Sequence, residues 1–82
     1  MVSDLTILEI MTMNKGFTMT KVKAERLKRG WSQQTLGYRA DIGAADVQRI
    51  ENKRLVPYPG QAKKLARVLG LSVHELQDEV RE

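Results

Sequence analysis

Apolar residues recur three or four positions apart through residues 20–82, which is the spacing of helices that bury one face. Thr20 is suited to cap a first helix that ends at Arg29, because the following Gly30 readily adopts the left-handed backbone of a helix stop. Three more helices are predicted over residues 33–40, 44–52 and 59–69. A fifth is predicted to begin after Ser72, where SVHE has the form of a capping box. The pattern therefore predicts an all-α domain of five short helices.

The first 18 residues differ from the rest, because they are apolar, rich in threonine and nearly uncharged. We therefore expect an N-terminal extension over residues 1–18 and a single domain over residues 19–82. The alternation from Leu5 to Met13 slightly favours a strand in the extension. A helix that starts after Ser3 is nearly as compatible with the same residues.

Composition excludes most catalytic chemistry. A chain of 82 residues has room for one small domain and little room for a deep substrate cavity. It contains no cysteine and a single histidine, His74, which excludes thiolate and multi-histidine metal sites. No apolar run approaches the roughly 20 residues of a membrane span. We expect no enzymatic activity, no metal, no cofactor, no small-molecule substrate and no membrane partner.

Charge is distributed unevenly along the chain. Thirteen of the 14 basic residues lie within residues 15–67, where only four residues are acidic. Both ends carry net negative charge, although the whole chain has a net charge of +4. A basic middle of this kind favours a surface that faces a polyanion such as nucleic acid. From charge alone, a lysine-rich solvated surface explains the distribution equally well.

The segment of residues 31–52 carries the main functional signal. Two helices of about eight residues are separated by Asp41-Ile42-Gly43, which is the plan of a helix-turn-helix unit. In that unit the second helix enters the major groove of DNA. Asp41 tolerates the left-handed backbone that such a turn often needs. The outward face of the second helix would then carry Ala44, Ala45, Gln48 and Arg49.

Longer motifs extend this pattern over two thirds of the chain. They are SQQTL at 32–36, RIENKR at 49–54, PYP at 57–59 and LARVLGLS at 65–72, followed by Glu75-Leu76. In combination they resemble the XRE family, the Cro/cI-type helix-turn-helix regulators. The resemblance implies a lambda-repressor-like fold and a DNA-binding transcriptional regulator, for example a repressor. It also implies a cytoplasmic, nucleoid-associated protein of a prokaryote or phage.

The resemblance implies that base edges are contacted by Gly43, Ala44, Ala45, Gln48 and Arg49. Arg49 is the best candidate for a bidentate contact with guanine O6 and N7, and its alternatives are a phosphate or an ion pair with Asp46. Relatives often carry Gln, Arg or Ser in place of the two alanines, so two bidentate contacts are lost. The remaining departures from the family pattern are Gly37, Gly43 and Tyr58. Together these changes predict a slightly loosened recognition surface.

The resemblance also implies contacts with phosphates. The resemblance assigns one phosphate contact to Gln33 and another to Asn52 with the backbone near Lys53 and Arg54. The charges of Arg39, Lys53 and Arg54 also suit phosphates, although Arg39 is nearly as well explained as a solvated charge. The resemblance further implies a partly buried salt bridge between Arg26 and Glu51.

We expect the protein to bind double-stranded DNA as a homodimer. The predicted fifth helix carries more apolar residues than one small core can bury, and it is the first candidate for the dimer interface, through Leu71, Val73, Leu76 and Val80. The second candidate is the extension, since an apolar strand over residues 5–13 can pair with its symmetry mate.

Two alternatives to a sequence-directed regulator stay open. In the first, an antitoxin-like protein covers a partner with residues 1–18 and regulates its own promoter through the helix-turn-helix. In the second, a weakly specific protein coats DNA, as the alanines at 44 and 45 would allow. Because related domains often begin just before the first helix, Met19 is also suited to be the natural start, which would make residues 1–18 an appendage.

Overall fold

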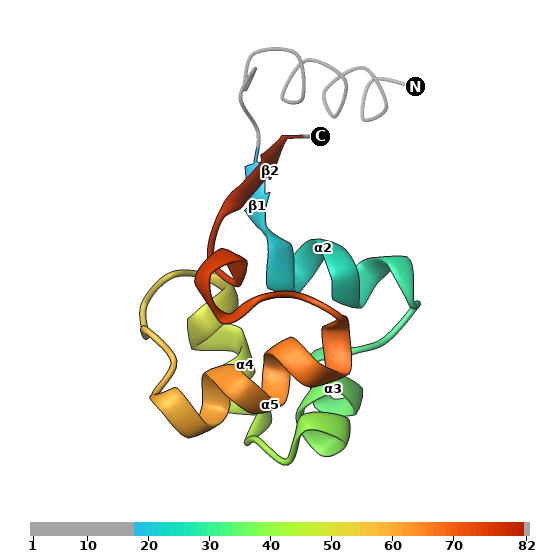
Figure 1. Cartoon of the computed structure of the whole chain (residues 1–82). Coiled ribbons are helices and arrows are strands. Elements are labelled where there is room, and N and C mark those ends of the chain that lie inside the picture. Colours follow the sequence, from blue (N-terminus) through green and yellow to red (C-terminus); the bar gives the residue numbers. More distant parts are fainter. Residues whose placement is uncertain (1–17, 82) are drawn as a thin grey trace.

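The computed structural model describes residues 18–81, in which four helices surround one core and a small antiparallel sheet projects from one end (Figure 1). The elements follow in the order β1 (Thr18–Thr20), α2 (Lys21–Lys28), α3 (Gln33–Ala40), α4 (Ala44–Glu51), α5 (Pro59–Leu69), the 3-10 turn η1 (Val73–Glu75) and β2 (Glu79–Arg81). The predictions for the extension fall on residues 1–17, outside this described range, apart from its last residue, Thr18, which opens β1.

Polar caps and left-handed residues determine where the helices begin and end. The Thr20 hydroxyl accepts a hydrogen bond from the Lys23 N–H, and the Ser32 hydroxyl accepts one from the Thr35 N–H at 2.9 Å. Gly70 ends α5 with a φ of 68°. The four helices expected between residues 21 and 69 are confirmed, and only α2 and α4 end one residue earlier than predicted.

All four helices contribute to a single apolar core. Burying a side chain the size of Val or Leu contributes about 1.5–3 kcal/mol, so these contacts fix the helices relative to one another. Trp31 packs against the edge of the core, close to the start of α3. The buried members are Val22, Leu36, Ala40, Val47, Ile50, Ala62, Leu65, Ala66, Leu69 and Leu76.

The prediction of a fifth helix is wrong. The capping box after Ser72 forms, because the Glu75 carboxylate accepts from the Ser72 N–H at 2.8 Å, but it supports only the turn η1. The chain then becomes extended as β2, which pairs antiparallel with β1 and sets Met19 opposite Val80. Figure 1 shows the two strands side by side above α2. The described residues are therefore mostly helical, and not all-α as predicted.

Hydrogen bonds to the start of α2 explain why the predicted fifth helix does not continue beyond η1. The first N–H groups of a helix have no partner within it. Here the Lys21 N–H donates to the Asp78 carbonyl at 2.9 Å, and the Val22 N–H donates to the Leu76 carbonyl at 3.1 Å. A helix through residues 76–80 would direct these carbonyls along its own axis. The C-terminal segment therefore satisfies α2 instead of continuing as a helix.

Because the fifth helix does not form, the first candidate for the dimer interface is also wrong. Leu76 lies in the core with 1% of its surface exposed, so it is not available to a second chain. Leu71 is partly buried against the core, and Val80 is partly buried within β2. Val73 is exposed on η1. The four residues do not form one helical face, because the helix that would align them is absent from residues 73–81.

An ion pair joins η1 to α2, and it makes the stability of the folded state depend on pH in the acid range. The Lys21 ammonium lies 2.7 Å from a Glu75 carboxylate oxygen, and with the Ser72 N–H it lowers the pKa of Glu75 from 4.5 to about 2. A carboxylate whose pKa falls on folding stabilises the folded state above its unfolded pKa, and this contribution is lost as pH falls through the folded value.

We therefore expect Glu75→Gln to be less stable than the unsubstituted protein near pH 7. The difference should shrink between about pH 4.5 and pH 2, where the natural carboxylate becomes protonated. Urea unfolding at a series of pH values measures this difference. A difference that stays constant across the range would show that the Lys21–Glu75 hydrogen bond does not stabilise the fold.

Candidate nucleic-acid interface

The turn between α3 and α4 holds the two helices at a fixed angle. Asp41 adopts the left-handed backbone expected of it, with φ of 58° and ψ of 51°. The Ile42 N–H then donates to the Gly37 carbonyl at 2.8 Å, which ties the turn back onto α3. On the other side of the turn, α4 begins after Gly43 and buries Val47 in the core.

Gly37 makes this close approach sterically feasible. It is buried on α3, and a Cβ atom at this position would lie 2.5 Å from the Ile42 carbonyl oxygen. The expectation that Gly37 loosens the recognition surface is therefore wrong, because its missing side chain permits tight packing of the turn. Gly43 and Tyr58 differ in this respect. Gly43 has no side chain to cap α4, and the space around it is open. The side chain of Tyr58 makes no cap hydrogen bond to α5.

The five residues expected to contact bases lie at the N-cap of α4 and along its outward face, and each of them is exposed: Gly43, Ala44, Ala45, Gln48 and Arg49. The side chain of Arg49 is 59% exposed, and its Nη1 atom lies 3.1 Å from Oδ1 of Asp46. The other oxygen of Asp46 accepts from Gln61 Nε2 at 2.9 Å. The face therefore combines two alanines with the Asp46–Arg49 pair, and a hydrogen bond from Gln61 on α5 supports that pair.

A buried polar cluster attaches α4 to α2 and α3. Arg26 Nε donates to Glu51 Oε2 at 2.7 Å, and Arg26 Nη2 donates to Glu51 Oε1 at 3.1 Å. The side chains of Arg26 and Glu51 are 9% and 0% exposed. Gln33 Nε2 also donates to Glu51 Oε1, at 3.0 Å, and Arg26 Nη1 donates to the Trp31 carbonyl at 2.7 Å. The end of α4 is therefore tied to the start of α3.

The residues after α4 form a second group near the same end of the helix. Asn52, Lys53 and Arg54 are all exposed. Lys53 has a left-handed backbone with φ of 60°, and the Arg54 N–H donates to the Arg49 carbonyl at 2.8 Å, as in a Schellman helix end. Gln77 Nε2 braces this end by donating to the Ile50 carbonyl at 3.0 Å. The group is thus held in a defined conformation.

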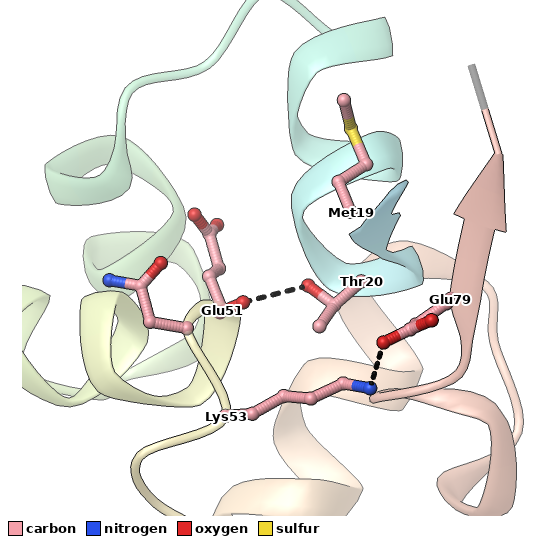
Figure 2. A pocket seen from close by; sticks show the side chains of 6 residues that line it. Met19, Thr20, Glu51, Lys53 and Glu79 are labelled. Atoms are coloured by element: carbon pink, nitrogen blue, oxygen red, sulfur yellow. Dashed lines mark hydrogen bonds and ion pairs between the residues drawn. The ribbon is translucent and has the colours of Figure 1, made fainter. Parts of the chain in front are cut away.

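A shallow hollow of about 130 Å³ lies between this group and the sheet (Figure 2). In Figure 2 the Lys53 ammonium reaches across it to Glu79 on β2, at 2.6 Å, and the Thr20 hydroxyl donates to the Glu51 carbonyl at 3.5 Å. The ammonium group of Lys53, which is expected to contact a phosphate, is therefore paired with a carboxylate of the protein itself.

Arg39 is the second residue of α3 that is expected to contact a phosphate, and it is exposed. It is six residues after Gln33, which places it about 9 Å further along the axis of α3. Its guanidinium carbon lies 4.6 Å from the centre of the Trp31 ring, and that of Arg29 lies 5.6 Å from it. Stacking of a guanidinium on an aromatic ring is favourable by itself. The structure therefore gives Arg39 a partner within the protein.

Sequence reasoning missed Gln61 and Gln77. Gln61 occupies the third position of α5, where a Gln often caps the helix, and its Oε1 accepts from the Tyr58 N–H at 3.0 Å. That local signal can be found in the sequence. The contacts of Gln61 with Asp46 and of Gln77 with Ile50 join residues 15 and 27 positions apart, and no local pattern indicates them.

The described part of the chain contains neither a metal-binding cluster of side chains nor a membrane-spanning helix. Among residues 18–81, no group of three or more His, Cys, Asp or Glu side chains is arranged to hold a metal ion. The helices in this range are too short and too polar to cross a bilayer.

A protein-family model described as a helix-turn-helix domain matches residues 20–78, which include α2, α3, α4, α5 and η1. Searches of curated proteins and of solved structures gave no significant match.

Proposed function

Because the chain belongs to the helix-turn-helix family of DNA-binding domains, we propose that it is a transcriptional regulator that binds double-stranded DNA in a sequence-directed way. It is of the XRE type, acts as a homodimer in a prokaryotic cytoplasm, and inserts α4 into the major groove. We propose repression as its mode of regulation, as its resemblance to the Cro/cI-type regulators implies.

The observation that carries this proposal is the contrast between the two faces of α4. The inner face is immobilised by Val47, Ile50 and the buried carboxylate of Glu51. The outer face is exposed and carries Gln48 and Arg49, whose side chains suit adenine and guanine. A rigid helix with an exposed hydrogen-bonding face meets the requirement for reading base edges.

Residues suited to phosphates lie beside this face. Gln33 is the first residue of α3, where unpaired N–H groups and the helix dipole favour an anion. Asn52, Lys53 and Arg54 follow the end of α4. Phosphate contacts beside the C-terminal end of α4 would set its position in the groove, while the base contacts supply the specificity.

Arg49→Ala should weaken binding to the preferred DNA site by about 1–3 kcal/mol, because a bidentate contact with guanine is lost. The preference at one base position should relax at the same time. Fluorescence anisotropy with labelled duplexes measures both effects. Lys28→Ala is the matched control, since it removes the same charge from the far end of α2. An equal loss on all sequences would identify Arg49 as a phosphate contact.

Gln33→Ala should weaken binding to preferred and random DNA alike, by about 1.5 kcal/mol for a hydrogen bond to a charged group. Because Gln33 is neutral, the dependence of affinity on salt should keep its slope. The same anisotropy titrations at several salt concentrations test this. Gln34→Ala is the control at an exposed neighbouring position. A loss confined to the preferred site would contradict the positioning role of Gln33.

Selection from a random double-stranded DNA library tests the function as a whole. A homodimer should recover a two-fold symmetric site with half-sites about 34 Å apart, or a multiple of that distance. Titration of the selected site in increasing salt should give a slope that corresponds to several phosphates per half-site. If no DNA sequence is enriched by the selection, the proposal of a sequence-directed regulator is wrong.

A weakly specific DNA-binding protein is the second candidate. It is favoured by Ala44 and Ala45, which are exposed where the reading helix begins and offer no side-chain hydrogen bond. Affinities that are flat across random duplexes would support this candidate, whereas a preference of about 10³-fold or more would exclude it.

A further inference from the structure

We propose that Gln61, on the first turn of α5, is a positioning residue that orients Arg49 for base recognition by holding the carboxylate of Asp46. The inference rests on the proposed function, because it assigns a new residue to the same DNA-reading face. It places part of the control of specificity outside the helix-turn-helix unit, in a helix that does not itself present the reading face.

Three hydrogen bonds connect α5 to the reading face. Gln61 Oε1 accepts from the Tyr58 N–H at 3.0 Å, which fixes the side-chain amide against the start of its own helix. The Nε2 atom of the same amide donates to Asp46 Oδ2 at 2.9 Å. The second carboxylate oxygen, Oδ1, accepts from Arg49 Nη1 at 3.1 Å. Each group therefore uses a different atom for each neighbour.

Gln61 is well placed to act as the fixed end of this chain. It is partly buried, and its helix begins with Pro59, whose ring fixes φ at the first helical position. The following residues Ala62 and Leu65 are buried in the core. The amide is therefore attached to a rigid part of the domain, whereas Asp46 and Arg49 lie on the outer face of α4.

Without this support, the pair of Asp46 and Arg49 would be a poor means of orienting a side chain. Its members are three residues apart, and their side chains are 32% and 59% exposed. Exposed pairs of this kind contribute little, because water screens the charges and two long side chains must be ordered. A neutral donor on Oδ2 fixes the plane of the carboxylate and so restricts the direction from which the guanidinium can bind.

The orientation matters because guanine is recognised by two N–H groups at once. A guanidinium has five N–H donors, and one of them is directed to Asp46. The remaining donors can serve the O6 and N7 atoms of guanine only when the plane of the group matches the plane of the base. A preoriented Arg49 meets this condition before DNA arrives, and a freely rotating one meets it only part of the time.

Gln61→Glu separates the positioning role from the capping role. The new carboxylate can still accept from the Tyr58 N–H, so α5 keeps its cap. It cannot donate to Asp46, and two carboxylates would face each other where a hydrogen bond now lies. We expect the preference for the best base over the next best at the Arg49 position to fall at least about fivefold, with thermal stability nearly unchanged.

Combining Gln61→Glu with Asp46→Asn should restore the preference. The asparagine Nδ2 atom would donate to the new carboxylate, and its Oδ1 atom would still accept from Arg49. The total charge of the two positions also returns to its original value. Gln34→Glu is the matched control, because it adds the same negative charge at an exposed position of α3 and should lower affinity without altering base preference.

The readout is the full base-preference profile of each variant, from library selection, together with its melting temperature. A reduced preference for Gln61→Glu and recovery in the double variant would establish the positioning role. An unchanged profile for Gln61→Glu, or no recovery in the double variant, would overturn it while leaving DNA recognition by Arg49 intact. If Arg49→Ala also leaves the profile unchanged, the proposed base contact itself is wrong and this inference fails with it.

Discussion

Glu51→Ala is expected to lower the free energy of unfolding by about 3–5 kcal/mol, the usual cost of leaving one partner of a buried ion pair without the other. The side chain of Glu51 is fully buried, and its two oxygens receive three hydrogen bonds from Arg26 and Gln33. After the substitution, the Arg26 guanidinium loses its hydrogen bonds to Glu51 and keeps the one to the Trp31 carbonyl. The side chain of Arg26 is only 9% exposed, so water can replace little of what is lost. The loss is a large share of the roughly 5–15 kcal/mol that stabilises a typical domain.

Urea unfolding measures this loss by circular dichroism and by the fluorescence of Trp31, the single tryptophan. Glu25→Ala is the matched control, because Glu25 pairs with Lys28 and Arg29 at the surface and its removal should cost less than about 1 kcal/mol. Arg26→Met combined with Glu51→Leu should be more stable than Glu51→Ala, since no charge is left unpaired. Equal losses for Glu51→Ala and Glu25→Ala would contradict the structural role of the buried pair.

Loss of the Glu51 side chain would also allow α4 to move relative to α3, and this movement has a consequence for function. Glu51 is the last residue of α4, and Gln33 is the first residue of α3. Their hydrogen bond sets the end of the reading helix against the residue expected to contact a phosphate. We therefore expect Glu51→Ala to bind both preferred and random DNA more weakly, even under conditions in which the variant remains folded.

Gly37→Ala should destabilise the domain by about 1–3 kcal/mol, which is the usual cost of overpacking a closely packed site. The new Cβ atom would lie 2.5 Å from the Ile42 carbonyl oxygen, and that oxygen belongs to the backbone, so the turn must move to make room. The movement would also strain the hydrogen bond from the Ile42 N–H to the Gly37 carbonyl, which is 2.8 Å long. Helix propensity alone predicts the opposite sign, because alanine is favoured over glycine within a helix by about 1 kcal/mol.

Gly60→Ala provides the matched control. Gly60 also lies in a helix, and an added Cβ atom would have no neighbour within 4 Å. This variant should therefore gain about 0.5–1 kcal/mol from the reduced flexibility of the unfolded chain. The two substitutions are chemically identical, so opposite signs in urea unfolding would isolate the contact with the turn. A gain for Gly37→Ala would mean that the turn relaxes without cost.

Local signals in the sequence were sufficient for the helices between residues 21 and 69. Thr20 and Ser32 cap the first two of these helices, Asp41 adopts the left-handed turn, and Gly70 ends α5. These features depend on residues within a few positions of one another, so they can be found by inspecting short windows. The capping box after Ser72 is also local and also forms, but it supports only the turn η1.

Longer-range contacts decided the rest of the fold. The carbonyls of Leu76 and Asp78 accept from the first N–H groups of α2, so a segment with helical spacing becomes extended and ends in β2. That competition joins positions more than 50 residues apart, and the same tertiary contacts move Leu76 from an expected dimer surface into the core.

The sequence by itself determined the helix-turn-helix unit and the residue types on its outer face, because helical spacing alone decides which side chains share a face. It also led, through a family resemblance, to Arg26 and Glu51, which the structure places 2.7 Å apart. Only the tertiary structure decided that Gly37 permits a close contact and that Gln61 holds Asp46. Both depend on how two elements approach each other, and that geometry arises only when the whole core packs.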